Sequence, residues 1–193
     1  MRPTACQVNL VSPYDLGRQP FALAEPAALL ARDGFSVTCL DLSLQKLESI
    51  AWRDAAFVAI YLGMHTATRI ALEALPRIRT LAPRARICAY GLYAPMNAEL
   101  LRARGVTDVI GGEFEPALVA AARDARDGGR GDAAAAPVVH RGKVEFIVPE
   151  RVGLPGFIEA RRYRSHDDAS SPQPPRYFTC YWLASIDALV TPP

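Results

Sequence analysis

Short apolar runs alternate with amphipathic stretches between residues 6 and 126, and this alternation predicts strands separated by helices. The apolar runs predict strands over Val8–Ser12, Phe35–Asp41, Phe57–Tyr61, Arg86–Tyr90 and Val106–Ile110. The amphipathic stretches predict helices over Leu23–Arg32, Thr66–Leu81, Asn97–Gly105 and Pro116–Arg126, with a short helical turn over Leu44–Ile50. Proline lacks the backbone N–H, so Pro26 should be tolerated only in a first helical turn and Pro76 should kink its helix.

Strands that alternate with helices predict an α/β fold with right-handed crossovers and a parallel sheet. We expect a flavodoxin-like (Rossmann-like) five-stranded parallel sheet with the strand order 2-1-3-4-5. The switch point of this order lies between the first and third strands. A ligand is therefore expected at the carboxyl ends of strands one, three and four.

The composition changes after Arg126. We expect a Rossmann-like domain over residues 1–128, a linker with a small hairpin over 129–164, and a disordered tail over 165–193. The hairpin would join Val138–His140 to Val144–Val148. Serine, aspartate and proline dominate Ser165–Pro175, and the residues from Tyr177 onwards show no amphipathic period.

Composition and charge exclude several classes of protein. The 22 Lys and Arg against 20 Asp and Glu give a net charge of +2, without the clustered positive excess that a nucleic-acid binder would show. No apolar run reaches the length of about 18 residues that a membrane span needs, and no signal peptide is visible. Cys6, Cys39, Cys88 and Cys180 are too far apart for a zinc or iron–sulfur motif, and the first three lie in apolar runs typical of buried thiols. We therefore expect a cytoplasmic protein with neither nucleic acid nor membrane as a partner.

Tyrosines gather in the loops that would follow the strands. Tyr14, Tyr61, Tyr90 and Tyr93 are the tyrosines before residue 130, and each lies in or beside such a loop. They could form an aromatic, hydrogen-bonding floor beneath a large flat ligand, or they could fill the sheet edge with their hydroxyls in water. Their shared location favours the floor.

Several specific chemistries do not fit these loops. A phosphoacceptor domain would need an aspartate where Tyr61 ends the third strand. The first loop has neither the hydroxyl-rich sequence of a flavodoxin nor the G-x-G-x-x-G of a dinucleotide fold, and no Ser, His and acid grouping marks a hydrolase. His65 is more typical of a helix start than of a ligand, and the pair Gly111-Gly112 is a weak phosphate signal.

The sequences LVSPYDLGRQPF, VAIYLGMHTATRIA, ICAYGLYAP and VIGGEFE occur in this order. Together they resemble the cobalamin-binding N-terminal domain of radical SAM proteins, and most of all the subgroup with a Cys-rich C-terminal tail motif. The resemblance covers about residues 5–160. The cofactor-binding residues that it implies are Ser12, Pro13, Tyr14, Gly17, Gln19, Pro20, Tyr61, Gly63, Met64, His65, Thr66, Tyr90, Gly91, Tyr93, Gly112 and Glu113.

The departures from this family shape the expected function. Better-known cobalamin sheets carry Asp-x-His-x-x-Gly after the first strand, and here Tyr14 stands at the histidine position while Gly17 is kept. The resemblance therefore implies base-off cobalamin without a histidine ligand, with Gly91 allowing the backbone to approach the macrocycle. The family's CxxxCxxC loop is missing, so neither an iron–sulfur cluster nor catalysis by this chain alone is expected.

The expected function is a corrinoid-binding module that precedes a radical SAM barrel, in cis, in an intact relative. Two alternatives stay open: the same fold could hold a nucleotide, or it could be an interaction domain for a partner protein. The sequence is also compatible with a truncated or frame-altered product and with a natural stand-alone domain.

Overall fold

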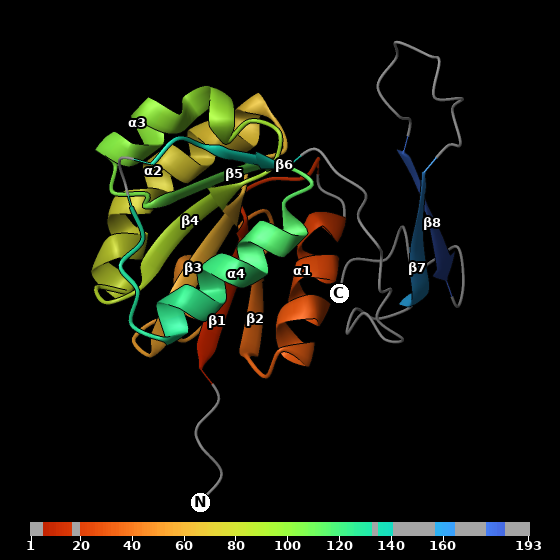
Figure 1. Cartoon of the computed structure of the whole chain (residues 1–193), viewed down its shortest axis with the longest axis horizontal. Coiled ribbons are helices and arrows are strands. Elements are labelled where there is room, and N and C mark those ends of the chain that lie inside the picture. Colours follow the sequence, from red (N-terminus) through yellow and green to blue (C-terminus); the bar gives the residue numbers. More distant parts are fainter. Residues whose placement is uncertain (1–5, 17–19, 133–134, 141–156, 165–176, 184–193) are drawn as a thin grey trace, which may run out of the picture. The chain divides into compact units, whose positions relative to one another are not determined.

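The computed structural model of the chain describes residues 6–16, 20–132, 135–140, 157–164 and 177–183 (Figure 1). The chain divides into two compact units, Met1–Lys143 and Val144–Pro193. The strands of the first unit are β1 (Gln7–Ser12), β2 (Ser36–Asp41), β3 (Ala55–Tyr61), β4 (Arg86–Tyr90), β5 (Asp108–Gly112) and β6 (Val138–His140). Its helices are α1 (Phe21–Arg32), α2 (His65–Leu81), α3 (Ala98–Ala103) and α4 (Glu115–Arg126), with short 3-10 helices at Leu47–Ser49 and Pro95–Asn97.

The six strands of the first unit form one all-parallel sheet with the order β2-β1-β3-β4-β5-β6. The expected α/β fold is therefore confirmed. The expected five strands in the order 2-1-3-4-5 are wrong, because a sixth strand, β6, follows β5 in the sheet. Val138–His140 pairs in parallel with Ile110–Gly112 instead of starting a local hairpin, because α4 carries the chain back to begin another strand beside β5. Val144–Val148, the other arm of the expected hairpin, lies outside the described residues.

Helices cover both faces of the sheet, and the alternating side chains of the strands divide the core into two layers. One layer joins Val11, Val58 and Ile60 to α2 and α3. The other joins Val8, Leu10 and Phe57 to α1 and α4, which lie side by side in Figure 1. The carboxyl ends of β1, β3 and β4 are therefore held by a sheet that is buried on both sides.

Pro26 lies in the second turn of α1, so the expectation that it fits only a first turn is wrong. A proline there cannot donate to the carbonyl of Ala22, four residues earlier. The buried hydroxyl of Tyr90 donates a hydrogen bond to this carbonyl at 3.2 Å. A side chain from β4 thus replaces the backbone donor that the proline removes.

Pro76 occupies the same kind of position in α2, which continues to Leu81. The carbonyl of Leu72, one turn earlier, loses its helical donor and accepts a hydrogen bond from Nη1 of Arg104 at 3.0 Å. In both helices a donor from another element therefore satisfies the carbonyl that an internal proline leaves open.

The three cysteines of the first unit differ in exposure. Cys88 in β4 is buried as expected. Cys6 is half-buried and Cys39 is exposed, because β2 forms an edge of the sheet. The expectation of three buried thiols is therefore wrong for Cys6 and Cys39.

The second unit contains β7 (Phe157–Arg164) and β8 (Tyr177–Leu183), which pair antiparallel. The expectation of a disordered tail is wrong for Tyr177–Leu183. The sequence YFTCYWL lacks an amphipathic period, but its aromatic residues and threonine favour an extended strand. Among the described residues, no helix combines the length and apolar composition that crossing a membrane requires.

Candidate functional site

The predicted site residues follow the ends of parallel strands, so the sheet brings them to one edge. Ser12, Tyr61, Tyr90 and Gly112 are the last residues of β1, β3, β4 and β5. Carboxyl ends of parallel strands meet at the same edge, where ligands of α/β folds bind. Gly17 and Gln19 lie outside the described residues.

An aromatic cluster lies at this edge. The ring of Tyr90 lies 4.9 Å from the ring of Phe114 and 5.5 Å from that of Tyr61, and the rings are tilted by 57° and 51°. Tyr90 is fully buried, and this burial raises the pKa of its hydroxyl well above the usual value. Tyr90 is therefore a core residue bonded to Ala22 rather than an exposed part of a ligand floor. Phe114 was not among the predicted site residues, although it lies just after Gly112, the last residue of β5.

Tyr61 fills the space that two of the predicted glycines leave. A Cβ atom on Gly63 would lie 2.7 Å from the Tyr61 hydroxyl oxygen. Gly91 has φ +106°, and a Cβ atom there would lie 2.9 Å from both the Leu62 carbonyl oxygen and the Tyr61 ring. These two glycines therefore accommodate a ring of the protein itself.

Large apolar side chains are exposed in the loops after β1 and β4. Leu16 is 62% exposed, Leu92 is 69% exposed and Met96 is 66% exposed. Because β3 pairs with both β1 and β4, these loops flank the end of β3 on its two sides. We call Leu16, Leu92 and Met96 the apolar rim. The half-buried side chains of Tyr14 and Tyr93 belong to the same two loops.

Ser12 is a buried polar residue at the end of β1. Its Oγ atom has no hydrogen-bond partner among the described residues, although its side chain is fully buried. Ser12 is in register with Asp41 at the end of β2, and Oδ1 of Asp41 accepts a hydrogen bond from the backbone N–H of Ser43 at 2.8 Å. A buried hydroxyl without a partner is costly, and a ligand atom or water would remove that cost.

The remaining predicted site residues also lie near the carboxyl edge of the sheet. Met64, Thr66 and Glu113 lie at helix starts or strand ends, with Thr66 exposed and the other two half-buried. The other predicted residues of this group are Pro13 and Pro20, both buried, and His65 and Gly112, both exposed. Within the described ranges, no group of three or more His, Cys, Asp and Glu residues could hold a metal ion.

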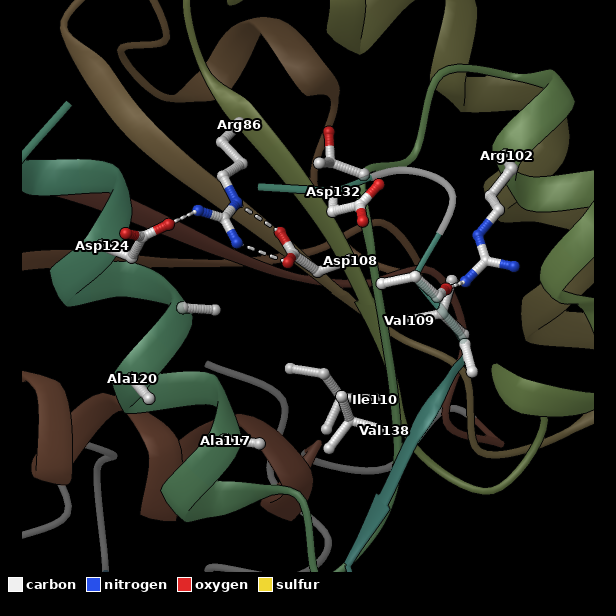
Figure 2. Close-up of a pocket in the computed structure, with 14 residues that line it drawn as sticks. Arg86, Arg102, Asp108, Val109, Ile110, Ala117, Ala120, Asp124, Asp132 and Val138 are labelled. Carbon is white, nitrogen blue, oxygen red and sulfur yellow. Dashed lines mark hydrogen bonds and ion pairs between the residues drawn. The ribbon is translucent and has the colours of Figure 1, made fainter. Parts of the chain in front are cut away.

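A pocket of about 370 Å³ opens at the other end of the sheet, beside the amino ends of β4 and β5 (Figure 2). Its lining comes from β4, β5, α3, α4 and the segment before β6. The sequence did not predict this pocket, because the strand order directs attention to the carboxyl edge of the sheet. A feature of the sequence that could have indicated this pocket is the pair Arg86 and Asp108. These oppositely charged residues are the first residues of the neighbouring strands β4 and β5.

An ion-pair network forms one wall of this pocket. Nε and Nη2 of Arg86 donate to the two carboxylate oxygens of Asp108, each at 2.6 Å. Nη1 of Arg86 donates to Asp124 of α4. The two hydrogen bonds to Asp108, and then the one to Asp124, raise the pKa of Arg86. Three of the five guanidinium N–H donors are thus used within the network.

No protein-family model matches the chain. A search of curated proteins found no similar sequence.

Proposed function

We propose that the chain is a corrinoid-binding module, similar to the cobalamin-binding N-terminal domain of radical SAM proteins and without catalysis of its own. The observation that carries the proposal is the apolar rim: Leu16, Leu92 and Met96, all more than half exposed, flank the carboxyl end of β3. A corrin ring is broad and flat, with largely apolar faces and a polar periphery. Exposed apolar patches at a ligand-binding edge are typical of sites that bury such a surface.

The described residues at the carboxyl edge of the sheet fit a corrinoid in two respects. The apolar rim would hold one face of the macrocycle, with Tyr61 between the two loops. The unpartnered hydroxyl of Ser12 would meet a polar atom of the nucleotide tail in the crevice beside β1. Tyr14 stands where a histidine would ligate cobalt, so the lower face would receive no protein nitrogen. When bound, the corrinoid would supply methyl or radical transfer to a barrel, and this chain would bind and orient it.

A nucleotide is the second candidate ligand. Asp41 ends β2, the position at which dinucleotide-binding folds place an acid on the ribose, and Ser12 lies beside it in register. Oδ1 of Asp41 already accepts the Ser43 N–H, so a ribose would have to share that carboxylate.

The test is retention of hydroxocobalamin by the purified full chain after desalting, measured by its visible spectrum. The double variant Leu92→Ser/Met96→Ser should weaken retention more than about tenfold, because burying each side chain contributes about 2 kcal/mol. Leu100→Ser is the matched control, since Leu100 is an exposed apolar residue of α3 outside the apolar rim. A wild-type protein that releases all cobalamin, while binding AMP in parallel dialysis, would favour the nucleotide instead.

A further inference from the structure

The pocket at the amino ends of β4 and β5 exists because the last strand is short. β6 pairs only with Ile110–Gly112, so β5 has no described strand beside Asp108 and Val109 on that side. The polypeptide before β6 and helix α4 pass on either side of this gap, and Figure 2 shows the resulting hollow. It is distant in the fold from the apolar rim, and what it binds does not depend on the proposed function.

Small apolar side chains make most of the pocket surface. α4 turns a row of alanines toward it, and the segment before β6 adds more, so no long side chain fills the space. The apolar lining residues are Val109, Ile110, Ala117, Ala120, Ala121, Ala135, Ala136 and Val138. Such walls suit a slender apolar body rather than a polar or bulky one.

One cation of the pocket has no direct ion pair in the described part of the chain. Arg86 is paired with Asp108 and Asp124, so its charge is already compensated. Arg102 of α3 forms no ion pair with any carboxylate in the described part of the chain, and it donates only to the carbonyl of Ala135. Its Nε atom is buried and has no hydrogen-bond partner there. In Figure 2 the Arg102 guanidinium points toward Val109.

We propose that this pocket binds a small molecule with a single carboxylate and a short unbranched apolar chain. The carboxylate accepts hydrogen bonds from the terminal Nη atoms of Arg102, and the chain lies along the alanines of α4. Arginine binds planar carboxylates through two parallel hydrogen bonds, so this head group matches the donor. A more highly charged phosphate fits less well, because Asp108, Asp124 and Asp132 also line the pocket and oppose further negative charge.

The test is a titration of the full chain with hexanoate, followed by ¹H–¹⁵N NMR. Saturable shifts are expected at the backbone amides of Val109, Ala120 and Ala135. Hexanamide, which has the same chain without the charge, should bind at least about tenfold more weakly, because a guanidinium makes stronger hydrogen bonds to a charged carboxylate than to a neutral amide.

Two variants separate the head group from the chain. Arg102→Gln should remove the preference for hexanoate over hexanamide, and Arg104→Gln is the matched control, because Arg104 bonds to the Leu72 carbonyl outside the pocket. Ala120→Leu should block the binding of both ligands, because the larger side chain fills the pocket. Ala120 is exposed, so this variant should fold and provides a test even if Arg102→Gln does not fold. Absence of saturable shifts, equal binding of the two ligands, or unchanged binding by Ala120→Leu would overturn the proposal.

Discussion

The hydrogen bond between Tyr90 and the carbonyl of Ala22 is expected to stabilise the first unit because of Pro26. In an ordinary helix residue 26 would donate its N–H to this carbonyl, and the Tyr90 hydroxyl would be a second, less important donor. With proline at position 26, the hydroxyl at 3.2 Å replaces that backbone donor. Tyr90→Phe removes the hydroxyl and keeps the ring in its contacts with Phe114 and Tyr61.

The expected loss of unfolding free energy for Tyr90→Phe is about 1.5 kcal/mol, the cost of leaving a partly buried carbonyl without a partner. In the Pro26→Ala background the new alanine has a backbone N–H that donates to the Ala22 carbonyl, so the same substitution should cost only about 0.5 kcal/mol. The double-mutant cycle should therefore give a coupling energy of about 1 kcal/mol. The direct effect of Pro26→Ala on packing cancels in the cycle.

Urea unfolding followed by the far-ultraviolet helical signal measures these free energies, because all described helices belong to the first unit. Arg104→Gln is a useful comparison: its bond to the Leu72 carbonyl is exposed, so water replaces the donor and the loss should stay below about 0.5 kcal/mol. A coupling energy near zero between positions 26 and 90 would refute the reasoning.

Three further predictions follow from the same structure. Asp108→Ala should destabilise the chain by about 3 kcal/mol in urea unfolding, because it leaves the largely buried charge of Arg86 without its main partner. Burial raises the pKa of Cys88 and of Tyr90 above their usual values of 9.0 and 10.0. The free energy of unfolding should therefore keep its full value below pH 9.0 and fall at higher pH, because the unfolded chain loses these protons first. Urea unfolding curves measured from about pH 8 to about pH 11 check this. Gly91→Ala should cost about 2 kcal/mol in thermal unfolding, since φ is +106° and Tyr61 occupies the space; an unchanged melting temperature would contradict this.

The first five strands were predictable because a strand covered on both faces is continuously apolar and is bounded by polar or glycine-containing turns. Arg86–Tyr90 matches its predicted span, whereas β5 begins at Asp108 rather than Val106. Val106 is buried and apolar like a strand residue, but it lies in the turn after α3 and its N–H donates to the Leu101 carbonyl. Burial alone therefore does not fix the end of a strand.

The candidate site was predictable as a location but not as a set of contacts. The loops after β1, β3 and β4 follow directly from the strand order, which brings Ser12 and Tyr61 to one edge. Which tyrosine would be buried depends on the long-range contact of Tyr90 with Ala22, 68 positions apart. No local pattern in the sequence contains that information, and the same holds for the ring of Tyr61 against Gly91.

The measurement that tests the central proposal most directly is electron paramagnetic resonance of cob(II)alamin mixed with an excess of the full chain. In free cobalamin the cobalt carries the nitrogen of its own base, which splits each cobalt line into a triplet. In the proposed corrinoid site Tyr14 would stand at the position of a cobalt-ligating histidine, and the nucleotide tail would enter the crevice beside Ser12, so we expect a base-off spectrum without nitrogen splitting. A spectrum that keeps the nitrogen triplets would contradict it, since cobalamin would then be unbound or bound with a nitrogen on cobalt.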